Sequence, residues 1–193
     1  MPSRSRVMIK ILLLLLVASN AMAIEEADYQ VIGNDGDLEI RQYPPHVVAE
    51  TLVQGEFKDV GNNAFRRLAG YIFGKNDADQ NISMTAPVTQ QETDDGYIVR
   101  FYMPAEHNLD DLPRPLDDSV NIYEAAGGVF AVLRYRGGWK QDSYLKHKDQ
   151  LIAQLEQSSA WQKNGEPTWA RYDPPFMPSF LRTNEVLIPV EPR

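Results

Sequence analysis

The sequence predicts an α+β fold in which a βαββ unit occurs twice, the two units forming a distorted, barrel-like antiparallel sheet with two helices. Short segments of alternating apolar residues, bounded by turn signals, indicate strands, whereas only two longer segments show helical spacing. Both halves of the chain follow one order: strand, glycine break, amphipathic helix, strand, strand. Because the halves share little residue identity, an unrelated α+β order that only looks symmetric is the alternative.

The first half opens with a hairpin and a third strand. Residues 29–33 and 38–43 are the strands of the hairpin, with Asp35-Gly36 at the turn and Pro44-Pro45 ending the second strand. Asp-Gly is favoured in such turns because the turn requires positive φ angles. A further strand over residues 47–53 leads through a glycine into the first helix.

The first helix is predicted over residues 57–73, where apolar residues recur at three- and four-residue spacing before Gly74, a typical helix terminator. Its apolar face consists of Phe57, Val60, Ala64, Phe65, Leu68, Tyr71 and Ile72. A strand over residues 82–89 follows, and Pro87 within it indicates an edge or a bulge. After a turn, a long strand is predicted over residues 97–103.

Residues 104–119 are rich in aspartate and proline and are predicted to form a crossover loop. Two acidic pairs, Asp110-Asp111 and Asp117-Asp118, flank the prolines. A calcium site is the alternative, but carboxylates that alternate with prolines do not converge on one ion. We therefore expect a solvated loop.

The second half repeats the plan of the first. A strand over residues 129–135 is followed by a break over residues 136–138 and a helix over residues 143–159. One face of that helix carries Tyr144, Leu145, Leu151, Ile152 and Leu155. Residues 168–172 and 185–190 then supply two closing strands.

Residues 1–23 have the features of a secretory signal peptide and are excluded from the predicted fold. An apolar run over residues 11–18 lies between basic residues and the small-x-small sequence Ala21-Met22-Ala23, after which we expect cleavage. The basic residues are Arg4, Arg6 and Lys10. A membrane anchor is the alternative, but this run has 8 residues where a spanning helix needs about 20. We therefore expect an exported protein, periplasmic or secreted.

Residues 24–193 are predicted to form a single domain, because removal of 23 of the 193 residues leaves 170, a usual size for one core. The removed segment carries three basic and no acidic residues, so its loss changes the formal net charge from −8 to −11. Such a charge opposes binding to nucleic acids and anionic membranes. The absence of cysteine excludes disulfides, thiolate chemistry and a lipoprotein anchor. We expect a soluble monomer without a stable membrane anchor after cleavage.

Signatures of common enzyme classes are absent from the sequence. There is no Gly-x-Ser-x-Gly elbow, phosphate-binding glycine loop, His-Glu-x-x-His pair or EF-hand spacing. The three histidines, His46, His107 and His147, are spread over a strand start, the crossover loop and the second helix. The sequence therefore predicts a binding protein rather than an enzyme, with no catalytic and no metal-ligating residues.

Large apolar residues gather near the end of the chain, in a segment that prolines keep from pairing as a central strand. They are Trp169, Tyr172, Pro174, Pro175, Phe176, Met177 and Phe180. We expect a loop over the mouth of the barrel, against which a flat apolar ligand fits. The alternative is a loop that fills the barrel with its own side chains.

Five motifs occur in one order over essentially the whole of residues 24–193, and with them the chain resembles the SOUL haem-binding proteins. They are Tyr43-Pro44-Pro45 after Leu38-Glu39-Ile40-Arg41, LAGYIFGKN at 68–76, SMTAPVT at 83–89, LRYRGG at 133–138, and Tyr172-Asp173-Pro174-Pro175 followed by Asn184-Glu185-Val186. The resemblance implies a duplicated βαββ barrel, similar to the effector-binding domains of multidrug-responsive regulators. It also implies reversible binding of haem or another tetrapyrrole as the ligand.

The resemblance places this ligand in a hydrophobic cleft bordered by the first helix and the segment after Tyr172. Carried over to this chain, the cleft is lined by Phe65, Leu68, Ala69, Ile72, Met84, Tyr172, Phe176 and Met177. The haem propionates need positive partners, for which Arg66 and Arg67 are the first choice and Arg171 and Arg182 the second. Basic residues used by some relatives align instead with Asn62, Gly70 and Met177.

Iron ligation is where the chain departs from some relatives, which carry a histidine at the position of Gln42 as a proposed axial ligand. Tyr172, Met84 and His46 could coordinate iron, but none aligns with an established ligand. We expect a protein that buffers, carries or scavenges haem and holds the ring more than the iron. The alternatives are a protein that binds another lipophilic small molecule, and a tetrapyrrole-modifying or hydrolytic enzyme using Glu50, Glu56 or Tyr172.

Overall fold

The computed structural model describes residues 24–35 and 38–193, and within them it has an α+β fold with two α-helices and a ten-stranded sheet. All strand pairs of the large sheet are antiparallel. The predicted signal peptide lies outside the described residues, as does half of the predicted Asp35-Gly36 turn.

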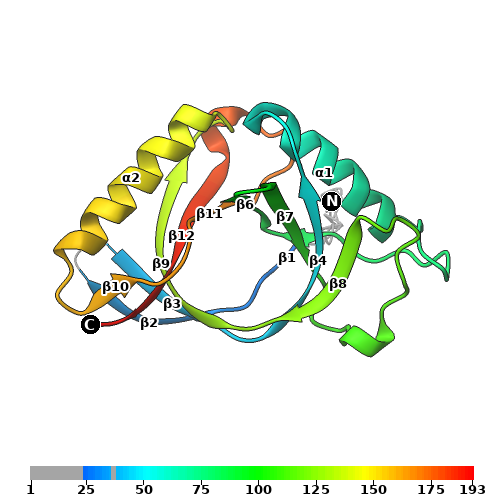
Figure 1. The fold of residues 1–193 in the computed structure, drawn as a ribbon, viewed down its shortest axis with the longest axis horizontal. Helices are drawn as coiled ribbons and strands as arrows, with labels where there is room; N and C mark the ends of the chain where they lie inside the picture. Colours follow the sequence, from blue (N-terminus) through cyan, green and yellow to red (C-terminus); the bar gives the residue numbers. More distant parts are fainter. Residues whose placement is uncertain (1–23, 36–37) are drawn as a thin grey trace, which may run out of the picture.

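The large sheet curves strongly, and both helices cover its outer face (Figure 1). Along the sheet the strands are β2 (Gln30–Asp35), β3 (Leu38–Tyr43), β9 (Gly128–Arg136), β12 (Thr183–Pro192), β11 (Thr168–Arg171), β6 (Val88–Thr93), β7 (Gly96–Tyr102), β4 (His46–Val53) and β8 (Val120–Ala125). Strand β10 (Trp161–Lys163) pairs with the end of β12. A separate parallel pair consists of β1 (Glu25–Glu26) and β5 (Thr85–Ala86).

The two helices form where the apolar spacing predicts them. Helix α1 spans Phe57–Ile72, one residue shorter than expected. Helix α2 spans Gln141–Gln157 and begins and ends two residues earlier than expected. Under α1, residues such as Val60 and Leu68 pack on β4 and β7, and under α2, Leu151 packs on β3 and β12. Each helix therefore covers its own half of the sheet with its own apolar cluster, although Phe57 at the start of α1 packs in the cluster under α2.

The duplication of the βαββ unit is confirmed by the order of the strands. The first unit is β4-α1-β6-β7 and the second is β9-α2-β11-β12, and their strands lie in the order β4-β7-β6-β11-β12-β9. The two units therefore meet at β6 and β11, and the strand order of the second unit is that of the first unit reversed, as a twofold axis between β6 and β11 requires. The sheet does not close into a barrel: β2 and β8 remain its two edges.

The two halves also exchange a strand each, which the sequence did not reveal. Strand β3 leads directly into β4 but pairs with β9, while β8 leads into β9 but pairs with β4. The two connections cross at Gly127, where an added Cβ would meet the carbonyl oxygen of Tyr43 and lie 2.6 Å from the carbonyl carbon of Pro44. Glycine is required there because the crossing backbones leave no space for a side chain.

Three predicted features need correction. The strand expected over residues 82–89 is interrupted at Pro87, which lies between β5 and β6, because proline has no N–H for a ladder bond. Strand β8 was not predicted, since it directly follows the aspartate- and proline-rich residues and reads as part of their loop. The crossover loop itself contains a short 3₁₀ turn over Leu109–Asp111.

The inner face of the curved sheet carries a row of side chains at one level, all of them polar except Ala170. The register places six residues side by side on consecutive strands β4, β7, β6, β11, β12 and β9: Glu50, Arg100, Thr89, Ala170, Glu185 and Arg134.

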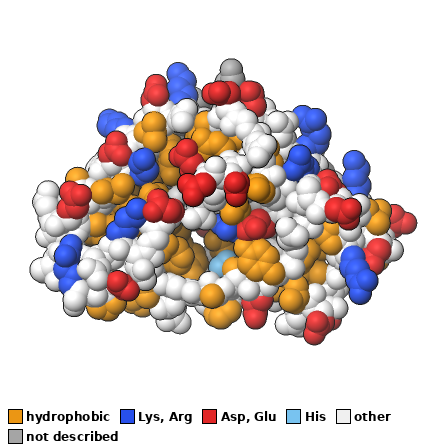
Figure 2. Space-filling view, in the orientation of Figure 1, with side chains coloured by type: hydrophobic (Ala, Val, Ile, Leu, Met, Phe, Trp, Pro, Cys, Tyr) orange, Lys and Arg blue, Asp and Glu red, His pale blue; other side chains and the backbone are white. Residues whose placement is uncertain are grey.

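In the space-filling view, acidic side chains are spread over the visible face and hydrophobic side chains surround a hollow near its centre (Figure 2).

Candidate functional site

A mainly apolar cavity of about 380 Å³ lies where α1, the strands β5 and β6, and the segment after β11 meet. It is lined by Ile24, Phe57, Gly61, Asn62, Phe65, Met84, Thr85, Ala86, Val88, Trp139, Trp169, Arg171, Tyr172, Asp173, Pro174 and Pro175. Its volume falls in the range of about 300–1,000 Å³ that small-molecule sites occupy. Among the hollows of the described residues, this one best combines enclosure with an apolar lining.

Local sequence explains how each wall of the cavity forms. On α1, Phe57, Gly61 and Phe65 are spaced four residues apart, so they share one face of the helix. On β11, Trp169 and Arg171 alternate with Ala170 and therefore point to the helix-covered side of the sheet. The prolines that follow end the strand and turn the chain across the cavity.

Arg171 borders the cavity and has no carboxylate as an ion-pair partner among the described residues. Arg171 donates from Nη2 to Oε1 of Gln90 at 3.1 Å, and its guanidinium carbon lies 4.8 Å from the ring centroid of Trp169 and 5.5 Å from that of Trp139. No salt bridge joins Arg171 to any residue in the described part of the chain. Burial lowers the pKa of Arg171 to about 10, because desolvation penalises the charged form.

Arg182, in contrast, donates hydrogen bonds to the chain segment that follows β11 and covers the cavity. Its Nε donates to the carbonyl of Met177 at 2.8 Å and its Nη2 to that of Pro175 at 2.5 Å. Its guanidinium carbon lies 4.2 Å from the centroid of Trp139. This arginine therefore holds the segment in place rather than facing a ligand.

Tyr172 connects the cavity to a buried ionic cluster on the inner face of the sheet. Its hydroxyl donates to Oε2 of Glu185 at 2.5 Å, and Arg41 binds both carboxylate oxygens of Glu185 at 2.9 Å. Burial raises the pKa of Tyr172, and the negative charge of Glu185 raises it further. Burial would also raise the pKa of Glu185, but hydrogen bonds and charge from Arg41 outweigh it, so that pKa is lowered. Tyr172 therefore stays a neutral phenol, and besides lining the cavity it packs on the apolar cluster that contains Tyr43 and Ala170.

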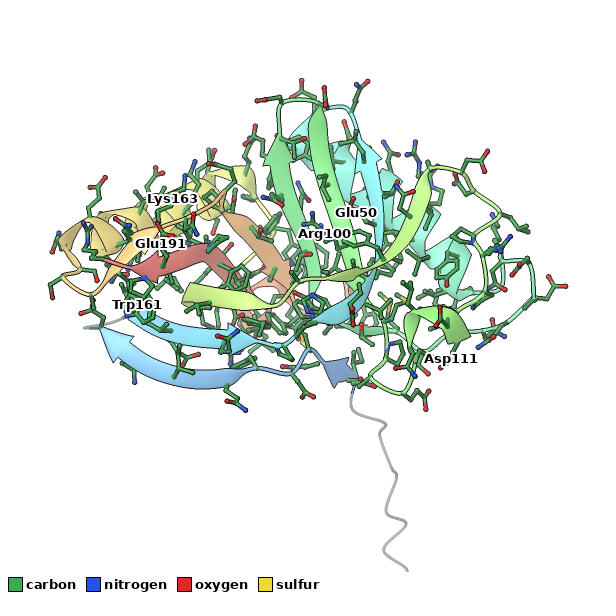
Figure 3. All side chains as sticks on the ribbon, turned by 60° about the horizontal axis from the view of Figure 1, so that its bottom comes forward. Glu50, Arg100, Asp111, Trp161, Lys163 and Glu191 are labelled. Atoms are coloured by element: carbon green, nitrogen blue, oxygen red, sulfur yellow. The ribbon has the colours of Figure 1, made fainter. Side chains whose placement is uncertain are left out.

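A second ionic cluster occupies the equivalent place in the first half. Glu50 accepts hydrogen bonds from Nε of Arg100 at 2.7 Å and from the hydroxyl of Tyr123 at 2.6 Å. Figure 3 shows Glu50 on β4 and Arg100 on β7 pointing toward each other. The strands that carry Glu50 and Arg100 correspond to those that carry Arg134 and Glu185, so the two ion pairs are equivalent with the charges reversed. Glu50 is thus a paired structural carboxylate.

Comparison with known proteins gives the family of the chain. The family model described as SOUL heme-binding protein matches residues 24–189. The chain belongs to the SOUL family. Human heme-binding protein 2 is 31% identical over 125 residues, which are 61% of this chain and 59% of that protein. Mouse heme-binding protein 1 is 32% identical over 130 residues, 64% of this chain and 67% of that protein.

The fold of this SOUL protein occurs beyond its family. The C-terminal domain of EcmrR superposes with a TM-score of 0.59 over 84% of this chain and 98% of that domain, at 12% sequence identity. At this identity the similarity concerns the fold alone. The names of the human and mouse relatives describe binding, in agreement with the binding role that the sequence predicts. The match spans only 59% of the length of the human relative.

The structure brings together only some of the cleft residues that the SOUL resemblance implied. Phe65, Met84 and Tyr172 line the cavity. Leu68 and Ile72 do not, because they are 0% and 1% exposed and pack into the core beneath α1. Leu68 and Ile72 follow Phe65 by three and seven residues and therefore lie on the same side of α1. They lie about one and two turns further along the helix, where α1 packs on the core of the sheet and no longer borders the cavity.

The remaining predicted residues lie around the cavity rather than in it. Arg66 and Ala69 line a more open hollow on the other side of Phe65. Arg67 donates to the carbonyl of Leu52 at 3.2 Å, away from the cavity. Phe176 is 86% exposed, and neither it nor Met177 lines the cavity.

Several lining residues escaped the sequence analysis. Phe57, Gly61 and Asn62 come from the first half of α1, and Trp139 comes from the connection between β9 and α2. The four-residue spacing of Phe57, Gly61 and Phe65 was a usable signal, since it places them on one helix face. Trp139 carried no local signal, because only the tertiary fold brings it to β11.

The three side chains considered for iron lie in different places. Met84 and Tyr172 line the cavity, whereas His46 stacks on Tyr102 at 4.6 Å and lines a separate hollow with acidic walls. Gln42 donates to the carbonyls of Tyr43 and Gly128 and does not line the cavity. In the described residues, no group of three or more His, Cys, Asp or Glu side chains is arranged to hold a metal ion. None of the described helices has the length and apolar character needed to cross a membrane.

Proposed function

We propose that this SOUL protein binds haem or a related tetrapyrrole in the cavity between α1 and the segment that follows β11. The observation that carries the proposal is a mainly apolar cavity of about 380 Å³, walled by Phe57, Phe65, Met84 and Trp169. Aromatic and thioether groups suit the faces of a flat ring. The names of the human and mouse relatives support haem as the ligand.

Titration of the purified protein with haemin tests this proposal. We expect a saturable change in the visible absorbance at one haemin per chain. Asn62→Trp should weaken binding at least about tenfold, because Asn62 lines the cavity from an exposed helix position where a large ring obstructs entry without disturbing the core. Asn63→Trp is the matched control, since its exposed side chain lies on the next position of α1 and outside the cavity lining.

Two outcomes of the titration would contradict the proposal. A flat titration of the wild type would exclude haem as the ligand, and another co-purified lipophilic molecule would then be the alternative. Equal haemin affinity in the wild type and in Asn62→Trp would place the haem site elsewhere. Both variants need unfolding curves like that of the wild type for the comparison to hold.

We further propose that the protein is exported and that it buffers, carries or scavenges haem outside the cytoplasm. Support for export comes from the basic, apolar and small-residue order of residues 1–23. Expression of the full chain should give a mature product that begins at Ile24, which intact-mass measurement determines. An uncleaved chain in the cytoplasmic fraction would contradict export. Release of bound haem to an apo-haem acceptor protein would support carriage, and its absence would contradict it.

A further inference from the structure

Arg171 is unlike the other arginines that the sheet buries. Burial lowers the pKa of Arg41 and Arg100, but hydrogen bonds and charges from Glu185, Tyr123 and Glu50 outweigh this, so their pKa is raised. For Arg171 burial prevails, because no carboxylate lies within ion-pair distance in the described chain. An uncompensated buried charge destabilises a protein. Such a charge at the wall of a cavity indicates a ligand-binding role.

Unpaired hydrogen-bond donors gather around the same guanidinium. Nε of Arg171, Nε2 of Gln90 and Nε1 of Trp139 are closed to solvent and have no acceptor within residues 24–35 and 38–193. All three are donors, and the amide oxygen of Gln90 is already occupied by Arg171. Buried donors without acceptors are rare in native proteins. The buried hydroxyl of Tyr135, which acts electrostatically on Arg171, also has no partner, so the surroundings of Arg171 hold more unpaired donors than acceptors.

The outer nitrogen of Arg171 is the atom placed to receive an acceptor. Nη1 makes no hydrogen bond to the described residues and lies against α1, where a Cβ added at Gly61 would be 2.9 Å away. Gly61 thus leaves space for the guanidinium between helix and strand. The one carboxylate of the cavity wall, Asp173, accepts instead from the backbone N–H of Thr183 at 2.5 Å.

We propose that Arg171 is the anion-binding residue of the cavity, so that the cavity selects flat aromatic ligands that carry a carboxylate. The ring lies against the apolar walls, and the carboxylate pairs with the guanidinium that rests on Trp169. This selectivity rests on the proposed binding of a tetrapyrrole and adds which chemical group the site recognises. It replaces Arg66 and Arg67, the first choice from the sequence, by a residue that borders the cavity.

Comparison of haemin with haemin dimethyl ester tests the proposal, because the ester keeps the ring and iron but lacks the charge. The wild type should bind haemin at least about tenfold more tightly than the ester. Arg171→Met should reduce that ratio to less than about threefold, mainly by weakening the binding of haemin. Ligand-free Arg171→Met should unfold at the same or a higher temperature than the wild type, since it removes an unpaired buried charge.

Two further variants make the test specific. Arg114→Met removes the same charge from an exposed position of the crossover loop and should keep the wild-type ratio. Gly61→Ala keeps the charge but displaces Nη1, so its ratio should fall even if Arg171→Met does not fold. Equal affinity of the wild type for acid and ester, or a wild-type ratio in both cavity variants, would overturn the role of Arg171 and leave haem binding intact. Failure of both ligands to bind would overturn the proposed function and, with it, this inference.

Discussion

Replacing Glu185 by glutamine tests whether the buried ionic cluster holds the second half of the sheet and Tyr172 in place. Glu185 is 0% exposed and accepts from Arg41 on both oxygens at 2.9 Å, from Nε of Arg134 at 2.6 Å and from the Tyr172 hydroxyl at 2.5 Å. Glu185→Gln keeps the shape but removes the charge and turns one acceptor into a donor. Among the described residues, Arg41, itself 2% exposed, then keeps only Glu39 as an ionic partner.

The expected loss follows from this geometry. Removing one partner of a buried ion pair costs about 3–5 kcal/mol, and we expect about 3 kcal/mol here because Glu39 still pairs with Arg41. For a domain of this size that lowers the Tm by about 6–12 °C. Arg134→Gln is the control, because Arg134 is 51% exposed and its ion pair should contribute less than about 1 kcal/mol.

Urea unfolding of the two variants measures the difference, and its pH dependence supplies a second check. The folded-state pKa of Glu185 is depressed below its ordinary value of 4.5, so its stabilisation is present above that value and is lost as the pH falls through the folded-state pKa. The gap between wild type and Glu185→Gln should therefore shrink in acid. A loss below about 1 kcal/mol, or one equal to that of Arg134→Gln, would refute the assignment.

Three other predictions concern the crossing of the halves, the iron, and the residues Phe65 and Leu68 of α1. Gly127→Ala should destabilise the protein by about 3 kcal/mol in urea unfolding, because the added Cβ meets the backbone of Pro44. Gly33→Ala is the control and should change stability by less than about 0.5 kcal/mol, because an added Cβ there has no atom within 4 Å. Similar values for the two variants would contradict the crossing of the two connections at Gly127. Gln42→His should leave the haem spectrum unchanged, since Gln42 lies outside the cavity, and an altered spectrum would place the iron near β3. Leu68→Ala should cost about 2–5 kcal/mol of stability, whereas Phe65→Ala should chiefly weaken haemin binding; the reverse pattern would mean that the turn of α1 that carries Leu68, and not the one that carries Phe65, borders the ligand.

Much of the fold followed from local patterns. The apolar spacing of α1 and α2 and the alternation in β4, β7, β9 and β12 predicted these elements within a few residues, because periodicity reflects burial of one face. The repeat of the unit predicted the symmetric sheet. The sequence did not predict strand β8 or the exchange of β3 and β8 between the two halves. That exchange depends on pairing between segments that are far apart in the chain.

The sequence likewise predicted part of the candidate site, and the tertiary structure decided the rest. The sequence by itself determined that α1 and the segment after Tyr172 border the proposed cleft, since family motifs mark both. It also determined the residues available there, including Phe65, Met84 and Arg171. Only the tertiary structure decided that Phe57, Gly61 and Phe65 face the cavity while Leu68 enters the core, because these residues share one side of α1 and the neighbouring segments decide which part of that side is covered by the core. It also decided that Arg171 rather than Arg66 borders the cavity, since whether a cation is buried or paired depends on neighbours that are distant in sequence.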